Sequence, residues 1–210
     1  MKKLSDFVEF ISGSPQFRIT QVFDEKAPVY TYYSQTDLSD DLKGIISSDL
    51  DNKQVRTDDK VSTLSSGDVV FSLISGNASI VNKEHNGYLF TQNYVKLVPN
   101  KDIDPKFLVY LINENRLIKK QFMFGLQGSQ VLKYTLKQLK ELEMPHIPPM
   151  DKQRTIGTVY FNQLKLKAIK TRKIELETAI LLAKLEEAIR NEWKRLWNWV
   201  NSIYYKWNNN

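Results

Sequence analysis

The feature that most constrains this chain is a long C-terminal stretch without proline. From Asp151 onward it contains a single glycine and is rich in Lys, Leu, Glu, Ile and Ala, all compatible with a long helix. Apolar residues recur every seven positions at Leu182, Ile189, Leu196 and Ile203, with Leu185, Trp193 and Val200 between them. This period is typical of a coiled-coil seam. A helix over residues 151–205 would be about 80 Å long at ~1.5 Å per residue. We therefore expect the seam to need a partner helix, from a second copy or from another protein.

The first 150 residues indicate an α/β (α+β) domain with a mainly antiparallel sheet. Strands are expected at 29–33 and 69–74, and residues 34–41 between them are read as a polar loop. Asn86-Gly87 is a hairpin signal between apolar runs. Closely spaced strands of this kind favour antiparallel pairing.

Helices are expected after the strands. Asp104 and Pro105 predict a cap and a first helical position, followed by helical spacing through Ile118. Thr135 with Gln138 predicts a capping box. A proline-marked segment, 144–149, then gives the expected boundary. The predicted organisation is a domain over 1–150, a long helix over 151–205 and a tail over 206–210.

Composition narrows the class of protein. Hydrophobic residues make up 41% and charged residues 26%, as in an ordinary soluble chain, and no apolar run approaches the roughly 20 residues of a spanning helix. The absence of cysteine removes disulfides, thiolate nucleophiles and cysteine-ligated zinc. A cytoplasmic protein without membrane association is the default expectation.

Charge is unevenly distributed along the chain. Residues 1–100 carry 10 Lys/Arg against 13 Asp/Glu, and residues 101–210 carry 20 against 11. Seven basic residues precede Glu175 in the expected helix, opposed by Asp151 alone. A basic half fits contact with a polyanion such as nucleic acid. Surplus lysine on a solvated helix face is the alternative.

Catalytic motifs are missing from the sequence. There is no Gly-x-Ser-x-Gly elbow, no phosphate-binding loop and no strand-linked Gly-x-Gly-x-x-Gly for a cofactor. His85 is expected to be exposed in a tight turn, and His146, between prolines, to pack or form a hydrogen bond locally. Neither has the clustered carboxylates that a metal site needs, so no metal and no catalytic residue are predicted.

Several side chains suit DNA contact. Asn and Gln amides can read adenine in the major groove, Arg can read guanine, and Lys can contact phosphates. Taken singly, each candidate is more often an ordinary polar surface residue, and the DNA-binding interpretation depends on their agreement with one another. The predicted DNA-binding residues are Arg18, Asn77, Gln92, Asn93, Gln127, Gln130 and Lys133.

Aromatic residues crowd the last twenty positions. Helical spacing places Trp193 and Trp197 on one face, which favours packing against a partner. An interfacial membrane anchor is the rival interpretation. The expected partner-helix residues are Leu182, Leu185, Ile189, Trp193 and Leu196.

The order of these segments resembles a specificity subunit of a type I restriction–modification system, with a single target-recognition domain. The most specific part runs from Gly128-Ser129-Gln130 through the proline segment and into Pro148-Pro149-Met150-Asp151-Lys152-Gln153-Arg154-Thr155-Ile156. Weaker echoes are 11–15 and 66–70. The resemblance covers residues 4–189 and does not extend to the aromatic tail.

The resemblance implies a DNA-reading component without catalysis of its own. Methyltransferase (M) subunits using S-adenosylmethionine and a restriction (R) subunit using ATP and Mg would act with it at a bipartite site in double-stranded DNA. This chain would bind none of those cofactors itself. With one recognition domain, it would form a homodimer or pair with another half subunit. Two alternatives stay open: a coiled-coil interaction or regulatory protein without base recognition, and an enzyme using unpaired carboxylates.

Overall fold

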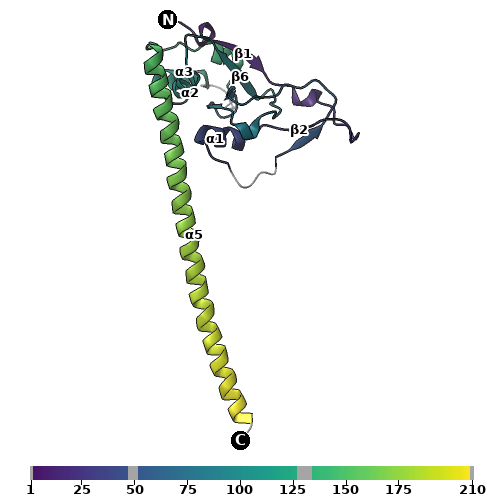
Figure 1. Cartoon of the computed structure of the whole chain (residues 1–210), viewed down its shortest axis with the longest axis vertical. Helices are drawn as coiled ribbons and strands as arrows, with labels where there is room; N and C mark the ends of the chain where they lie inside the picture. Colours follow the sequence, from purple (N-terminus) through teal and green to yellow (C-terminus); the bar gives the residue numbers. More distant parts are fainter. Residues whose placement is uncertain (1, 47–51, 127–133, 209–210) are drawn as a thin grey trace. The chain divides into compact units, whose positions relative to one another are not determined.

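The structure, a computed structural model, describes residues 2–46, 52–126 and 134–208. The chain divides into two compact units, Met1–Lys165 and Leu166–Asn210. The first unit holds the sheets, helices α1 to α4 and the opening turns of helix α5 (Met150–Asn208), and the second is the remainder of that helix (Figure 1). The expected long C-terminal helix is confirmed.

The central sheet of the first unit is antiparallel. Its strands are β1 (Val8–Ser12), β4 (Val69–Ser72), β5 (Ala78–Ile80) and β6 (Tyr94–Pro99), in the order β1-β6-β4-β5. A second antiparallel pair joins β2 (Val29–Thr31) to β3 (Gln54–Arg56). The expected mainly antiparallel α/β architecture is therefore confirmed.

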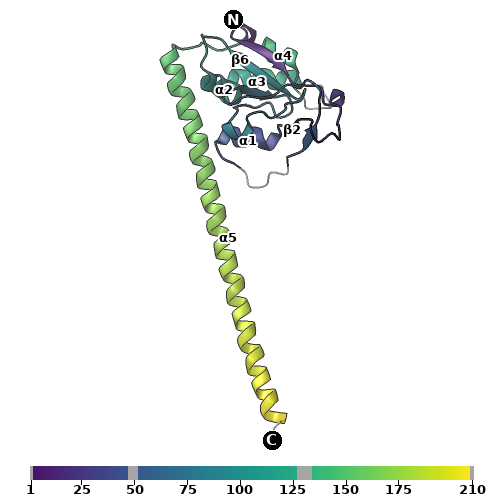
Figure 2. The same cartoon turned by 45° about the vertical axis from the view of Figure 1, so that its right-hand side comes forward.

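Strand β4 is buried on both faces, because its successive side chains point to opposite sides of the sheet and a core covers each side. In β4, Val69 and Phe71 pack into the larger core, whereas Val70 packs into a smaller core with Leu38 of helix α1 (Gln35–Lys43). The larger core receives helices α2 (Pro105–Glu114), α3 (Arg116–Leu126) and α4 (Leu136–Glu141). Figures 1 and 2 show α2 beside α3 in both views.

Two helix starts follow the sequence signals. The Asp104 carboxylate accepts the backbone N–H of Phe107 at 3.0 Å, with proline in the first turn of α2. Thr135 and Gln138 form the expected capping box at α4. Each cap satisfies N–H groups that a helix leaves without internal partners.

Three sequence expectations are wrong. Residues 34–41 are not a loop: helix α1 begins after Ser34, whose side chain accepts the Asp37 N–H, and ends at Gly44 with φ +64°. The helix after Asp104 breaks at Asn115, whose carboxamide oxygen accepts the Leu117 N–H and so opens α3. Asn86-Gly87 forms a turn but no hairpin, since β5 and β6 are separated in the sheet by β4.

The edge of strand β5 is occupied by a side chain. The Asn113 carboxamide accepts the backbone N–H of Ala78 at 2.8 Å and donates to the Ala78 carbonyl at 2.9 Å. One residue of α2 thereby makes the pair of bonds that a neighbouring strand would make.

No helix in the described part of the chain is long and apolar enough to cross a membrane.

Candidate nucleic-acid interface

Several predicted DNA-binding residues gather at one end of the central sheet. Strand pairing places Ser12 opposite Val95, and Ser72 opposite Tyr94. Strands β1 and β4 therefore end where β5 and β6 begin. The connecting segments 13–28, 73–77 and 91–93 all leave the sheet at this end, which we call the recognition end.

Asn77, Gln92 and Asn93 are brought together there. The backbone N–H of Gln92 donates to the Ser14 carbonyl at 3.0 Å, and the carbonyl of Asn93 accepts from Leu73 at 2.8 Å. The side chains of Asn77 and Gln92 are exposed, and that of Asn93 is half-buried. Backbone bonds hold these positions while the exposed amides remain accessible to a ligand.

Tyr134 ties a fourth segment to the recognition end. Its backbone N–H donates to the Leu73 carbonyl at 2.9 Å. Its ring packs against Gly76 so closely that a Cβ atom on that glycine would lie 2.4 Å from a ring carbon. Gly76 also has φ +69°, which glycine adopts without strain. The predicted residues Gln127, Gln130 and Lys133 lie outside the described residues.

Arg18 lies on the segment between β1 and β2, beside aromatic residues that the sequence reasoning missed. Its guanidinium is 5.5 Å from the centre of the Phe17 ring, and Phe17 is 76% exposed. Phe23, on the same segment, is 92% exposed. The segment is braced, because Val22 donates to the Arg56 carbonyl and Thr20 to the Asp59 carboxylate. Composition gave no signal for this exposure, since isolated phenylalanines are most often buried.

His85 is not exposed, contrary to expectation. It is 2% exposed, its Nδ1 lies 2.7 Å from an Asp41 oxygen, and its Nε2 lies 3.3 Å from Asp37. The Tyr33 hydroxyl donates to the other Asp41 oxygen at 2.7 Å. Ser34 donates to Asp37 from both its N–H and its hydroxyl. The cluster fastens α1 to the turn at 82–85.

Burial and charge act in opposite directions on His85. Burial lowers its pKa, but the hydrogen bond to Asp41 and the charges of Asp41, Asp37 and Asp40 outweigh burial and raise the pKa above its ordinary 6.5. Burial, with the neighbouring Asp41, also raises the pKa of Tyr33. Because these groups satisfy one another away from solvent, the cluster is a structural brace.

The described residues contain no group of three or more His, Asp or Glu side chains placed to hold a metal ion. The accessible chemistry of the recognition end is instead hydrogen bonding by amides, cationic contact and apolar contact. These are the means by which proteins read base edges and phosphates.

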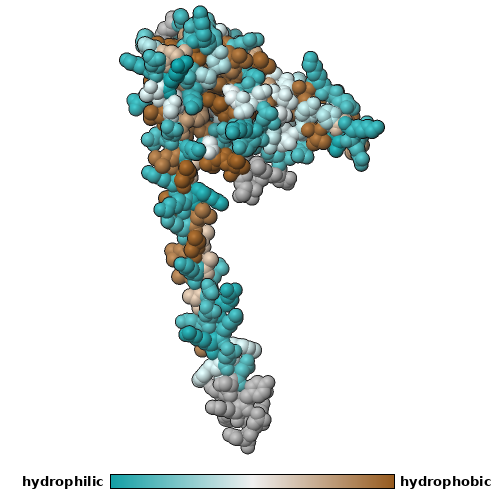
Figure 3. Space-filling model, in the orientation of Figure 1, coloured by the Kyte–Doolittle hydropathy of each residue, from teal (hydrophilic) through white to brown (hydrophobic). Residues whose placement is uncertain are grey.

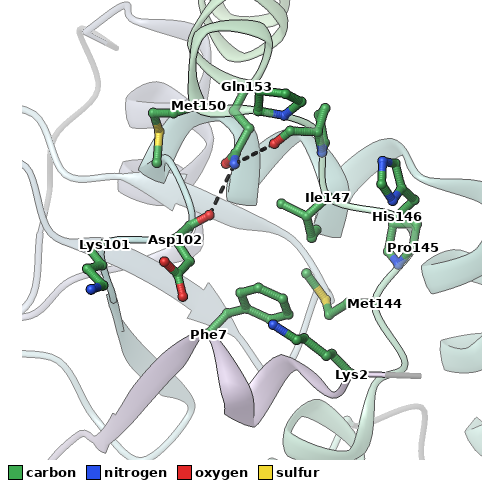
Figure 4. Close-up of a pocket in the computed structure, with 12 residues that line it drawn as sticks. Lys2, Phe7, Lys101, Asp102, Met144, Pro145, His146, Ile147, Met150 and Gln153 are labelled. Atoms are coloured by element: carbon green, nitrogen blue, oxygen red, sulfur yellow. Dashed lines mark hydrogen bonds between the residues drawn. The ribbon is translucent and has the colours of Figure 1, made fainter.

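Gln153 organises the start of α5 (Figure 4). Its carboxamide nitrogen donates to the carbonyls of Asp102 and Pro148, at 3.1 and 2.9 Å, and its oxygen accepts the Asp104 N–H at 2.9 Å. Only 2% of the residue is exposed. It joins the loop before α2, the proline segment and α5, beside a pocket of about 960 Å³. His146, predicted to pack locally, is exposed at that pocket.

The expected partner-helix residues all lie on α5 in the second unit, with exposed side chains. They are Leu182, Leu185, Ile189, Trp193 and Leu196. Large apolar side chains exposed in a row at helical spacing indicate an interaction surface.

Residues 1–179 match the family model of the type I restriction modification DNA specificity domain. A search of curated proteins finds no match.

Solved structures share the fold. The HsdS subunit from Thermoanaerobacter tengcongensis is 19% identical and superposes with a TM-score of 0.55, covering 90% of this chain and 43% of its own. A second match is a chain from a structure titled as the structural basis underlying complex assembly and conformational transition of the type I R-M system. It is 20% identical and superposes with a TM-score of 0.57, covering 89% of this chain and 43% of its own. This chain thus spans less than half the length of either.

Proposed function

Because the chain belongs to the family of type I restriction modification DNA specificity domains, we propose that it is the sequence-reading component of a type I restriction–modification complex. It directs partner adenine methyltransferase and restriction subunits to a bipartite DNA site and contributes no catalytic group. The observation that carries the proposal is the span of the family match, 1–179, through the whole domain and into the long helix. S-adenosylmethionine, ATP and Mg belong to the partners in this scheme.

The recognition end supplies the base contacts. Asn77 and Gln92 offer exposed amides that can pair bidentately with adenine, and Arg18 can pair with guanine. Phe17, beside Arg18, offers an apolar surface to a thymine methyl group. The backbone carbonyl of Asn93 accepts the Leu73 N–H and so helps to hold the segment that carries Gln92.

A bipartite site has two half-sites, and the described residues hold one domain that could read one of them. The exposed row on α5 from Leu182 to Leu196 supports pairing with a second copy. A symmetric dimer reads an inverted repeat with a fixed spacer, because protein and site share the two-fold axis. Pairing with a different half subunit gives an asymmetric gapped site instead.

The test is genome-wide mapping of methylated adenine with and without the gene. Loss of one gapped palindromic motif is the expected result, and loss of a gapped asymmetric motif would replace the homodimer by a mixed pair. Unchanged methylation in a strain that expresses the protein would contradict the proposal and favour a coiled-coil regulatory protein. Complementation with the double variant Asn77→Ala/Gln92→Ala should not restore the motif, whereas Asn162→Ala, an exposed amide on α5, should restore it.

A further inference from the structure

The small sheet of β2 and β3 has one exposed face. The two strands pair Val29 with Arg56 and Thr31 with Gln54. Because side chains alternate along a strand, these two pairs share one face, and Val55 points to the other. Val55 is buried, whereas Gln54 is exposed and Val29 is 48% exposed. The exposed face, which we call the outer face of the ribbon, consists of Val29, Thr31, Gln54 and Arg56.

Backbone hydrogen bonds hold both edges of this ribbon. On the side of β2, the Thr31 carbonyl accepts the N–H of Leu89 at 2.8 Å. On the side of β3, the Arg56 carbonyl accepts the N–H of Val22 at 2.9 Å. The Arg56 guanidinium also donates to the Ala27 carbonyl at 2.8 Å. The ribbon is thus fastened along both edges, and its outer face is the part left open to a ligand.

Gln54 is held in one orientation on the outer face. Its carboxamide nitrogen donates to the hydroxyl of Thr31, the residue directly opposite, at 3.4 Å. The second N–H of that nitrogen and the carboxamide oxygen have no hydrogen bond to another described residue. A donor and an acceptor side by side match the N7 acceptor and the N6 amino donor of adenine in the major groove. Because Thr31 orients the amide beforehand, less side-chain freedom is lost on binding.

The neighbours of Gln54 also suit the major groove, which is about 12 Å wide and admits a two-stranded ribbon. Val29 lies two residues before Thr31, about 7 Å along the strand, and can contact a thymine methyl group about two base pairs away. Lys53 is exposed, with its ammonium 5.5 Å from the centre of the Tyr32 ring, and can contact a phosphate. Figure 3 shows apolar patches among polar side chains around the position that β2 has in Figure 1.

We propose that Gln54 reads one adenine of the target site in the major groove, and that Thr31 is the positioning residue for its carboxamide. The inference rests on the proposed function. It adds a base position to those assigned to the recognition end, because the ribbon is a separate element with its own exposed face.

The first test maps methylated adenine genome-wide in a strain whose gene carries Gln54→Ala. One A·T position of the motif should become degenerate, with discrimination at that position falling roughly 10- to 100-fold and the other positions kept. Thr31→Val should relax the same position less, and Thr31→Ser, which keeps the hydroxyl, should restore it. Gln163→Ala, an exposed glutamine on α5, is the matched control and should leave the whole motif unchanged.

The second test detects the contact atom. The full-length chain, assembled with its methyltransferase subunits, is given duplexes with adenine or 7-deazaadenine at the relaxed position. Loss of N7 should weaken binding about tenfold for the unchanged chain and at most about twofold for Gln54→Ala. Equal losses in the two proteins would overturn the inference.

The outcomes separate this inference from the proposed function. A motif that depends on the unchanged gene but stays fully specified in Gln54→Ala would overturn the inference alone. A uniform loss of methylation at every site, by a variant with an unchanged melting curve, would assign Gln54 to a protein contact or to general affinity and would also overturn it. If no methylated motif depends on the unchanged gene, the proposed function is contradicted and the inference falls with it.

Discussion

Replacing Gln153 by alanine should lower the free energy of unfolding of the first unit by about 3 kcal/mol. The carboxamide makes three hydrogen bonds, at 2.9, 2.9 and 3.1 Å, in a side chain that is almost fully buried. Each lost bond costs about 1 kcal/mol, because alanine leaves the N–H of Asp104 and the carbonyls of Asp102 and Pro148 without this partner. For a unit of this size the melting temperature should fall by roughly 6–12 °C.

Thermal and urea denaturation followed by circular dichroism measure the effect. Gln163→Ala is the matched control, since it removes an exposed glutamine from the same helix. Gln153→Glu should be at least as damaging near pH 7, because its carboxylate can accept from Asp104 but faces two carbonyl oxygens. Protonation near pH 4 should recover part of that loss. A loss below 1 kcal/mol for Gln153→Ala, or one equal to the control, would refute the role assigned to these bonds.

Three other perturbations have defined outcomes. The raised pKa of His85 means that the folded state binds its proton more tightly than the unfolded state, so the stabilisation is fully present below about pH 6.5 and is lost as the pH rises through the folded-state pKa. The urea midpoint of the unchanged chain should fall between pH 6 and pH 8.5, and the midpoint of the His85→Gln variant should fall less over the same range. Equal slopes of urea midpoint against pH in the two proteins would contradict this linkage. Asn113→Ala should cost about 2 kcal/mol, since both backbone groups of Ala78 lose their partner, and an unchanged urea midpoint would rule this out. Gly13→Ala should lower the melting temperature, because its Cβ would lie 2.2 Å from the Thr91 carbonyl oxygen; a wild-type melting curve would show that the close approach is relaxed without cost.

Sequence patterns sufficed where a local rule decides the structure. The caps at Asp104 and Thr135 were predictable because the bonded atoms lie three residues apart. Helix α5 was predictable because it has no proline and its apolar residues keep a helical period over many turns. The antiparallel sheet followed from the short spacing of its strands.

Patterns failed where a distant segment decides the structure. Helix α1 was missed although Ser34 and Asp37 form a capping box, because its polar composition favours a loop until its carboxylates are paired with His85 and Tyr33. The burial of His85 depends on Asp41, which is 44 residues away. The recognition end is made of segments that come together only through the order of the strands in the sheet. Asn77 and Gln92 could therefore be predicted as separate DNA contacts, but not as parts of one surface.

The side chain on strand β5 has a consequence for assembly. An open strand edge is a template on which another molecule can add its own strand, and such addition leads to uncontrolled aggregation. Asn113 already occupies the N–H and the carbonyl of Ala78, so an incoming strand meets a blocked position on this edge. The fold thus discourages strand addition at β5, whereas the apolar row on α5 from Leu182 to Leu196 stays exposed to other protein chains.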